Sequence, residues 1–410
     1  MCFLMAATAL LTYSCTTSEE ENILSTQDYI SLNPDMASTY AAMMDLDSLK
    51  NDNNGFFVHA EMNDNSTYIY GENHVYDAKN GWSFSTPYPW PATGYPMTFY
   101  AYYPAPSVSN LYSLCSECFP APYVFPMMIP TSKEDQEDLL FARKTANSKP
   151  DSGELPLDFI HILSKVNFTV STTDALGPIS DPNHKVYVLA VGFCNLYAGS
   201  WFWGDNIEFG PCFTPQDFNY FNSFEPISSG IYEEKDFADA TNASFYSSAD
   251  GQKEHLFLLP QEPDVWDVTS GAGPQPDEAY IKMLYRLENS FYNDSIGYEF
   301  ASNHPDYEDS DLEAAGYDGP LYLLVGYSFD ATWVSGTAYS YNIPLPGGGG
   351  GILLDTYFYD NQGNQTDLAF DCNLYDHVFG SSCKLASAVY DWDYKAPKKS
   401  FDFVTTRTGR

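Results

Sequence analysis

Short segments in which apolar and polar residues alternate recur along this chain, and they constrain its fold more than any other feature. The clearest runs from Phe159 to Val170. One face of this segment carries Ile160, Ile162, Val166, Phe168 and Val170. The other face carries His161 and Lys165, which would be neighbours on one face of a helix but are not in this period of two. The pattern predicts a strand whose His161 and Lys165 point outward or toward a junction between domains.

Comparable segments follow one another from the N-terminal part of the chain to its end. They cover 56–61, 66–70, 80–85, 97–103, 123–129, 138–142, 185–193, 255–260, 280–287, 321–327, 337–345, 352–359 and 386–392. Clusters of Gly, Pro, Asn and Asp separate them, as turns separate strands. The 33 Tyr and 28 Phe outnumber Lys and Arg together (18), which favours strands over helices. The chain is predicted to be all-β and built of β-sandwiches.

A change in composition divides the chain. Residues 145–156 are rich in Ser, Pro, Asp and Gly, which is typical of a linker. About seven strands are predicted on each side of this stretch, which is enough for one sandwich on each side. We therefore expect an N-terminal β-sandwich at 31–150 and a C-terminal one at 151–410. Glu134 to Lys144 and 308–315 are the only stretches that suggest short helical turns.

The N-terminus resembles a bacterial lipoprotein signal. Residues 1–14 are apolar and too short to span a bilayer, and they end in small residues just before Cys15. The acidic stretch after Cys15 predicts a tether over 15–30 rather than a buried strand. We expect acylation of Cys15, which would hold the chain on the outer face of the outer membrane without a spanning helix. No Lys or Arg precedes the apolar run, so the signal is expected to start upstream of Met1.

The charge balance and the motifs exclude several classes of function. With 18 basic and 55 acidic residues the net charge is −37, which repels nucleic acid. The sequence contains no nucleophile elbow, no zinc-protease motif and no dinucleotide fingerprint. The five-glycine run at 347–351 lacks the Lys and helix of a phosphate-binding loop, and the acidic cluster at 306–313 lacks a calcium-loop pattern. We predict a protein that is no enzyme and carries no cofactor or metal.

Six cysteines remain once Cys2 and Cys15 are assigned to the signal and to acylation. They are Cys115, Cys118, Cys194, Cys212, Cys372 and Cys383. An exported chain crosses an oxidising compartment, which makes disulfides plausible, and proximity in sequence suggests the pairs 115–118, 194–212 and 372–383. The connectivity stays open at this point. The lone Cys-x-x-Cys has no second ligand pair for zinc and no βαβ context for redox chemistry.

Six landmarks, in order, resemble the fimbrillin family of pilus subunits. They are Met97-Thr-Phe-Tyr-Ala-Tyr-Tyr-Pro104 after Trp90-Pro91, Gln136-Glu-Asp-Leu-Leu-Phe-Ala142, Leu157-Asp-Phe-Ile-His161-Ile-Leu-Ser-Lys165-Val166, His255-Leu-Phe-Leu-Leu-Pro260-Gln261, Trp333-Val-Ser-Gly336-Thr-Ala-Tyr339-Ser-Tyr341 and Val389-Tyr-Asp-Trp392. The resemblance spans residues 56–392 and gives His161, Lys165, Pro260, Gln261, Trp333, Gly336, Tyr339 and Tyr341 as signature residues of the framework.

This resemblance implies two tandem transthyretin-like sandwiches in a subunit that joins others by strand exchange. In the family, an Arg-directed protease trims the first strand and a neighbour's strand fills the groove, a form of β-augmentation. Here no Arg precedes Arg143, so an anchor, a tip or a solitary adhesin is favoured over a stalk subunit. Its partners would be fimbrial subunits, outer-membrane lipid through Cys15, and a host or bacterial surface ligand. The alternative is a glycan-binding surface lipoprotein of a nutrient-uptake system, served by Tyr and Trp converging on one groove.

Acylation of Cys15 is the first testable prediction. Metabolic labelling with a fatty acid should mark the wild-type protein, because the apolar run and the acidic stretch flank Cys15 as in a lipoprotein signal. Cys15→Ala removes the only thiol at the predicted cleavage point and should abolish the label. Label retained in the Cys15→Ala protein would contradict the lipoprotein assignment.

Overall fold

A computed structural model describes most of the chain between residues 29 and 399. The described residues are 29–36, 46–91, 95–104, 124–172, 186–222, 224, 235–236, 243–246, 254–267, 270, 272–287, 321–330, 332–345, 352–359, 365–366, 384–385, 387–391 and 397–399. Cys15 and the predicted signal and tether lie outside them, apart from residues 29 and 30. So do the glycine run at 347–351 and the acidic stretch at 306–313.

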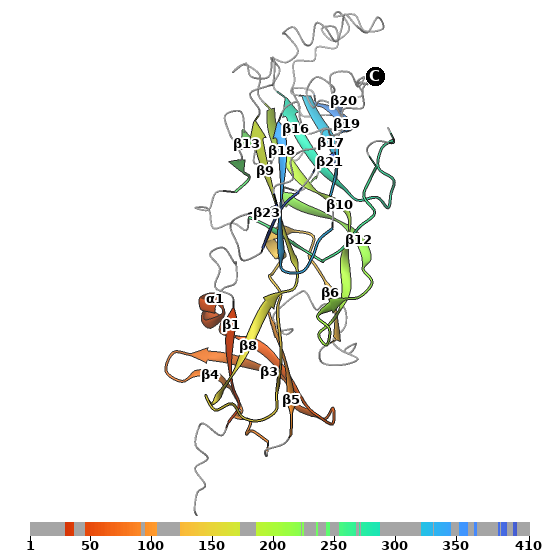
Figure 1. The fold of residues 1–410 in the computed structure, drawn as a ribbon. Coiled ribbons are helices and arrows are strands. Elements are labelled where there is room, and N and C mark those ends of the chain that lie inside the picture. Colours follow the sequence, from red (N-terminus) through yellow and green to blue (C-terminus); the bar gives the residue numbers. More distant parts are fainter. Residues whose placement is uncertain are drawn as a thin grey trace, which may run out of the picture.

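These residues form three β-sheets (Figure 1). The first has seven strands in the order β1-β8-β7-β5-β2-β3-β4: β1 Ser31–Met36, β2 Phe56–Met62, β3 Thr67–Asp77, β4 Gly81–Phe84, β5 Met97–Tyr103, β7 Leu140–Ala146 and β8 Glu154–His161. The helix α1, Leu46–Asn51, lies between β1 and β2 in sequence.

We call the seven-stranded sheet with α1 the first unit and the other two sheets the second unit. The ten-stranded sheet contains β6 Val124–Met128, β10 Val186–Trp203, β11 Glu208–Phe209, β12 Phe213–Phe221, β13 Lys235–Asp236, β16 Tyr280–Leu287, β17 Leu321–Phe329, β19 Ile352–Tyr359, β20 Gln365–Thr366 and β21 Lys384–Leu385. The six-stranded sheet contains β9 Ser164–Thr172, β14 Ala243–Ser244, β15 Leu256–Leu258, β18 Thr337–Leu345, β22 Ser387–Asp391 and β23 Pro397–Lys399.

The all-β prediction is confirmed, and the predicted strands at 97–103, 280–287, 337–345 and 352–359 match β5, β16, β18 and β19 residue for residue. The seven-stranded sheet lies at one end of the molecule, and the other two sheets lie at the other end (Figure 1). The predicted helical turn at 134–144 is limited to one 3-10 turn, Lys133–Asp135, before β7 begins. The likeness to transthyretin stays a prediction.

The core of the second unit forms where its two sheets face each other. Phe168 on β9 of the six-stranded sheet lies 5.0 Å from Phe193 on β10 of the ten-stranded sheet, measured between ring centroids. Tyr341 on β18 packs against both rings, and all three side chains are buried. Aromatic residues on alternate positions of facing strands fill a sandwich core in this way. The abundant Tyr and Phe of the sequence therefore serve packing first.

The segment predicted as one strand from Phe159 to Val170 belongs to two strands in two different sheets. β8 ends at His161 and β9 begins at Ser164, and both intervening residues, Ile162 and Leu163, are fully buried. We call residues 161–165 the crossing segment. Along a single strand, every second side chain points inward. Because Ile162 and Leu163 are both buried, the buried positions change from odd-numbered residues on β8 to even-numbered residues such as Val166, Phe168 and Val170 on β9.

The shift in phase corrects the predicted faces of this segment. On β8 the buried set is Leu155, Leu157, Phe159 and His161, whereas Ile160 is 42% exposed. Lys165, which was expected to point outward or toward a junction, is only 4% exposed. His161 lies at the junction, where its Nδ1 is 2.9 Å from Oδ2 of the buried Asp138. Tertiary packing between two units overrides the pattern of one strand.

The chain passes between the two units more than once. β6 pairs with β10 in the ten-stranded sheet, and β7 and β8 then return to the seven-stranded sheet. β6 lies within the range expected for the first domain, and β8 lies within the range expected for the second. The change of sheet at the crossing segment begins 11 residues after the expected boundary at 150 (161 − 150) and 5 residues after the end of the linker-like stretch (161 − 156).

The loop between β6 and β7 fastens the two units together. The buried Gln136 donates from Nε2 to the carbonyl of Pro130 (2.8 Å), and its Oε1 accepts the backbone N–H of Phe257 on β15 (2.7 Å). Tyr100 on β5 donates to Asp205 of the second unit at 2.8 Å. The rings of Phe141 on β7 and Phe202 on β10 lie 4.9 Å apart. Polar and apolar contacts thus join the two cores.

Replacement of Gln136 tests this connection. Gln136→Ala leaves the buried N–H of Phe257 without that acceptor, so the free energy of unfolding should fall by about 1–3 kcal/mol. Chemical denaturation followed by fluorescence measures it. Gln275→Ala is the matched control, because Gln275 is exposed and its amide makes only one long contact (3.4 Å to Gly273). Equal stability of the two variants would contradict a fastening role for Gln136.

Candidate functional site

The first strand, β1, fills a groove between β8 and β4 of the seven-stranded sheet. β1 pairs in parallel with β8, from Ser31 opposite Glu154 to Met36 opposite Phe159. Its other side faces β4, the far end of the same sheet, where Ser31 Oγ donates to the carbonyl of Trp82 at 3.4 Å. Just before β1, Ile30 donates its N–H to the carbonyl of Tyr88 at 2.7 Å. The sheet therefore curls until its two end strands meet.

Alternate side chains of this first strand fill the groove. Ile30, Leu32 and Pro34 are buried, while Asn33 and Asp35 are exposed. Leu32 is entirely covered by the core of the seven-stranded sheet. Burial of one such side chain contributes about 1.5–3 kcal/mol. The strand is thus held by apolar contacts and by one ladder, and its side toward β4 has few backbone bonds.

A histidine takes the place of the missing ladder toward β4. Nε2 of His74, on β3, lies 3.3 Å from the amide nitrogen of Leu32 and 3.1 Å from its carbonyl oxygen. The ring is fully buried among the rings of Phe56, Trp82 and Phe84. Burial lowers the pKa of His74 to about 3, so the imidazole is neutral in the folded protein. The groove with β1 and His74 is the candidate site for strand exchange.

Neither β1 nor His74 was predicted from the sequence. Ile30, Leu32, Pro34 and Met36 do alternate with polar residues, so a strand signal was present. Pro34, Asn33 and Asp35 weaken that signal, because all three residue types are depleted in strands. An edge strand tolerates them, since Pro there need not donate to a ladder.

The signature residues of the second unit hold a loop against the crossing segment. Gly336, with a positive φ of 64°, donates its N–H to the carbonyl of Leu163 at 2.9 Å. Ser164 Oγ donates to the carbonyl of Val334 at 3.0 Å. A Cβ at position 336 would lie 3.1 Å from the carbonyl oxygen of His161, so glycine suits both the backbone angle and the space. Two landmarks far apart in sequence thus bind each other.

The aromatic signature residues stabilise the same loop from within. Trp333 donates from its indole nitrogen to the hydroxyl of Tyr341 at 3.1 Å, and that hydroxyl donates to the carbonyl of Asp330. The hydroxyl of Tyr339 donates to the carbonyl of Thr332 at 3.0 Å and accepts the N–H of Val334 at 2.9 Å. The three rings are buried. Their hydroxyl and indole groups satisfy loop backbone, which is a structural role.

The segment with Pro260 and Gln261 supports β10. The amide of Gln261 accepts the N–H of Tyr197 at 3.0 Å and donates to its carbonyl at 3.1 Å, as a neighbouring strand would. The carbonyl of Gln261 also accepts the N–H of Trp333 at 3.0 Å. Pro260, half-buried, directly follows the buried run that begins with β15. The hydrogen bonds of these signature residues therefore hold loops and strands of the second unit together; the residues are Gln261, Trp333, Gly336, Tyr339 and Tyr341.

The cysteines that the structure describes are not paired. Cys194 and Cys212 are free thiols, so the predicted 194–212 disulfide is wrong. In the register of β10 with β12, Phe193 lies opposite Phe218 and Gly199 opposite Phe213, which separates the two cysteines by about six residues, or roughly 20 Å, along the strands. A disulfide needs Cα atoms within about 7 Å. Cys115, Cys118, Cys372 and Cys383 lie outside the described residues.

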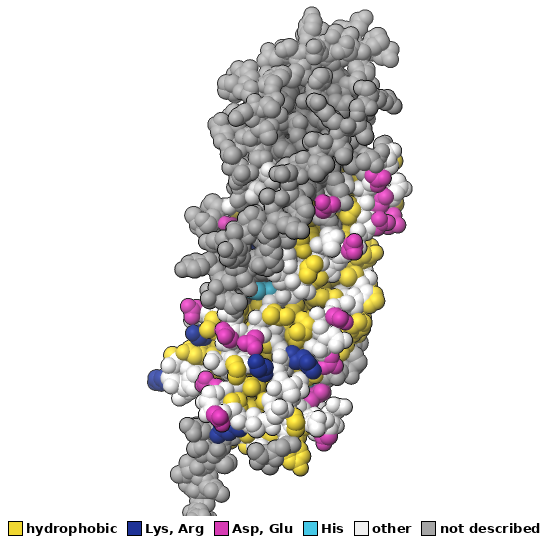
Figure 2. Space-filling view, viewed as in Figure 1, with side chains coloured by type: hydrophobic (Ala, Val, Ile, Leu, Met, Phe, Trp, Pro, Cys, Tyr) yellow, Lys and Arg dark blue, Asp and Glu magenta, His cyan; other side chains and the backbone are white. Residues whose placement is uncertain are grey.

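No cluster of three metal-binding side chains occurs among the residues that the structure describes. Acidic side chains are spread over the described face rather than gathered in one patch (Figure 2). In the same part of the chain, no helix is long and apolar enough to cross a membrane.

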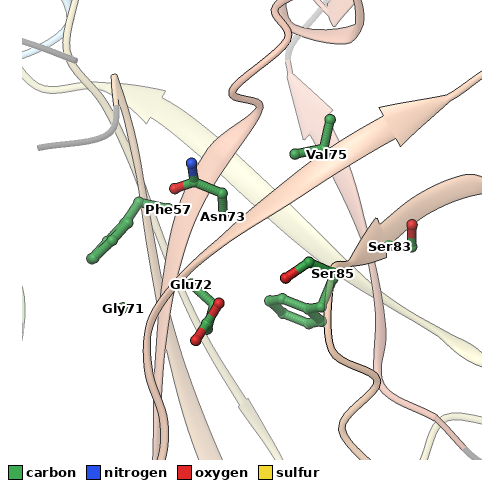
Figure 3. Close-up of a pocket in the computed structure, with 8 residues that line it drawn as sticks. Phe57, Gly71, Glu72, Asn73, Val75, Ser83 and Ser85 are labelled. Atoms are coloured by element: carbon green, nitrogen blue, oxygen red, sulfur yellow. The ribbon is translucent and has the colours of Figure 1, made fainter. Parts of the chain in front are cut away.

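A shallow pocket of about 560 Å³ opens on the first unit, beside strand β3. It is lined by Phe57, Gly71, Glu72, Asn73, Val75, Ser83, Phe84 and Ser85. In Figure 3, β3 runs between Phe57 on β2 and the serines at β4. No Tyr or Trp lines it: the exposed Tyr70 lies on β3 but outside the lining, and the exposed Tyr95, Tyr197 and Trp203 lie on other segments, so this pocket lacks the converging Tyr and Trp that a glycan groove was expected to show.

Comparison with known proteins places the chain in a family. The model of the fimbrillin-like family matches residues 43–356, which is most of the chain. The fold is similar to a fimbrial protein of Bacteroides vulgatus, with 15% identity, a TM-score of 0.50, and coverage of 77% of this chain and 94% of that one. The matched range begins after β1, ends within β19 and covers strands of both units, and the chain belongs to the fimbrillin-like family.

Other solved structures align over more of the chain with lower TM-scores. A candidate cell adhesion protein of Bacteroides uniformis has 13% identity and a TM-score of 0.40, covering 90% of this chain and 99% of that one. A candidate cell adhesion protein of Parabacteroides distasonis has 10% identity and a TM-score of 0.41, covering 89% and 96%. No curated protein sequence matches the chain. Membership of the family indicates a fimbrial or adhesin structural role.

The free thiols give a direct test of the structure. Burial raises the pKa of Cys194 to about 11, and it also raises the pKa of the half-buried Cys212, so both should react slowly with iodoacetamide at pH 7.5 while the protein is folded. Both should react fully in denaturant without reductant. Peptide mass spectrometry measures this. Protection of either residue in denaturant until a reductant is added would show that it is oxidised.

Proposed function

We propose that the chain is a structural subunit of a surface fimbria or adhesin that keeps its first strand and its lipid at Cys15. The observation that carries this proposal is β1 itself, seated in its groove with Leu32 buried and His74 against its backbone. A subunit in this state has a closed groove, so it accepts no strand from a neighbour. Such a subunit suits an anchor, a tip or a solitary adhesin better than a stalk.

The position of basic residues supports retention of β1. Arg143, the first Arg of the chain, lies on β7, which pairs with β5 and β8 in the interior of the seven-stranded sheet. Cleavage there would cut β7 within its own length, separate β1 to β5 from β8 and destroy the sheet. Lys50, on α1 between β1 and β2, is the only basic residue whose cleavage would free β1 alone.

Docking to other subunits would then use strands that this chain donates. The candidates are the C-terminal strands β19 and β22. Each is paired on both sides, β19 with β17 and β20, and β22 with β18 and β23. To donate either strand, the chain must first release it from its own sheet. Pairing with the strands that line a neighbour's groove would then replace the lost backbone hydrogen bonds.

N-terminal analysis of the protein recovered from the cell surface tests the proposal. The protein should begin at acylated Cys15, and Lys50→Gln should leave its size and N-terminus unchanged. The matched control is Lys79→Gln, which changes a basic residue in the exposed turn between β3 and β4. A protein that begins at Asn51, and whose processing Lys50→Gln blocks, would contradict the proposal and favour a stalk subunit trimmed by a Lys-directed protease.

A further inference from the structure

The contact between His74 and β1 has a chemical property that the other contacts of the groove lack. The apolar packing of Leu32 involves no ionisable group, and the register of β1 with β8 places the exposed Asp35 opposite the exposed Asp158. Among the described residues, His74 is a fully buried titratable side chain that contacts the backbone of β1, through Nε2 and Leu32. Its Nδ1 is buried and makes no hydrogen bond among the described residues.

We propose that His74 positions β1 in the groove and that protonation of His74 releases the strand. The inference rests on the proposed function, in which β1 closes the groove. It adds to that function a residue, His74, that hydrogen-bonds to the backbone of the strand in the groove. It also adds a condition, protonation at low pH, under which the groove opens.

The two nitrogens of His74 explain why the closed groove requires a neutral ring. In the neutral ring with its proton on Nε2, that proton is donated to the carbonyl of Leu32 and Nδ1 needs no acceptor, whereas the other tautomer would accept the N–H of Leu32 but leave the Nδ1 proton without a partner. The charged ring carries a proton on both nitrogens. The Nε2 proton would meet the Leu32 carbonyl, but the Nδ1 proton would lie buried among Phe56, Trp82 and Phe84 without an acceptor.

No charge near the ring offsets this cost. Burial depresses the pKa of His74 to about 3, and the hydrogen bond with Leu32 only partly opposes that effect. No charged side chain contributes to the pKa shift of His74; the charged residues on β1, β2, β3, β8 and α1 are Asp35, Asp47, Lys50, Glu61, Glu72, Asp77, Glu154 and Asp158. Lys50 pairs instead with Asp47 at 3.5 Å.

The direction of the pH dependence follows from these values. When β1 leaves, His74 meets solvent and its pKa rises toward the ordinary value of about 6.5. The stability of the closed groove is then complete above about pH 6.5 and is lost as the pH falls below it. Each pH unit between about 6.5 and the folded value of about 3 favours the open groove by at most about tenfold.

Hydrogen exchange of the full chain, read by mass spectrometry, measures the opening of β1. After correction for the pH dependence of chemical exchange, protection of residues 29–36 should fall by about tenfold between pH 6.0 and pH 5.0. Protection of β5, residues 97–103 in the interior of the same sheet, should change much less. Loss of protection by both segments together would indicate global unfolding. That result in the wild-type protein alone would overturn the proposal.

Two variants separate His74 from other buried histidines. His74→Gln keeps an amide that can bond the Leu32 backbone but cannot titrate, so the difference between the two segments should no longer depend on pH. His59→Gln is the matched control: His59 is buried on β2 of the same sheet with its pKa lowered to about 4, and its ring neighbours are Tyr70 and Tyr100, not β1. The pH dependence should persist in this control.

The same pH dependence in His74→Gln and in the wild type would refute the role of His74. That result would leave strand exchange untouched, because the experiment follows one isolated chain. Conversely, a protein trimmed at Asn51 on the cell surface would refute retention of β1 and leave the exchange result for the full chain intact.

Discussion

The contact between the crossing segment and the loop that follows β17 is the constraint on which the rest of the structure depends. Leu163 and Ser164 bond the backbone N–H of Gly336 and the carbonyl of Val334. These bonds fix the point at which the chain leaves one sheet and enters another. Because Ile162 and Leu163 are both buried there, the cores of the two units approach each other through the backbone itself, and no flexible linker separates them.

Around this point the landmarks of the family act as one framework. Asp138 and Gln136 approach it from the loop before β7, His161 from β8, and Trp333, Tyr339 and Tyr341 from the loop and β18. Their polar atoms bond mainly to backbone groups that would otherwise be buried without partners. Satisfying those backbone groups is a structural role for these polar residues.

The groove at the other end of the first sheet follows a different physical rule. Parallel pairing with β8 and burial of alternate apolar residues hold β1, but its side toward β4 has a histidine where another strand would have a ladder. An unpaired sheet edge invites association, and the first strand covers it within one chain. The first strand thus has a backbone ladder on one side only, unlike the interior strands of the same sheet.

The sequence by itself determined the fold class and most strands, because alternation of apolar and polar residues is a local property that survives in any all-β arrangement. It also determined the family, through landmarks whose polar residues must satisfy backbone. Only the tertiary structure decided that the best predicted strand is two strands, that Ile160 is exposed and Lys165 buried, and that Cys194 and Cys212 are apart. Those outcomes depend on which sheet each strand joins and in what register. His74 belongs with them, because the backbone that it contacts, at Leu32, lies 42 residues away in the sequence.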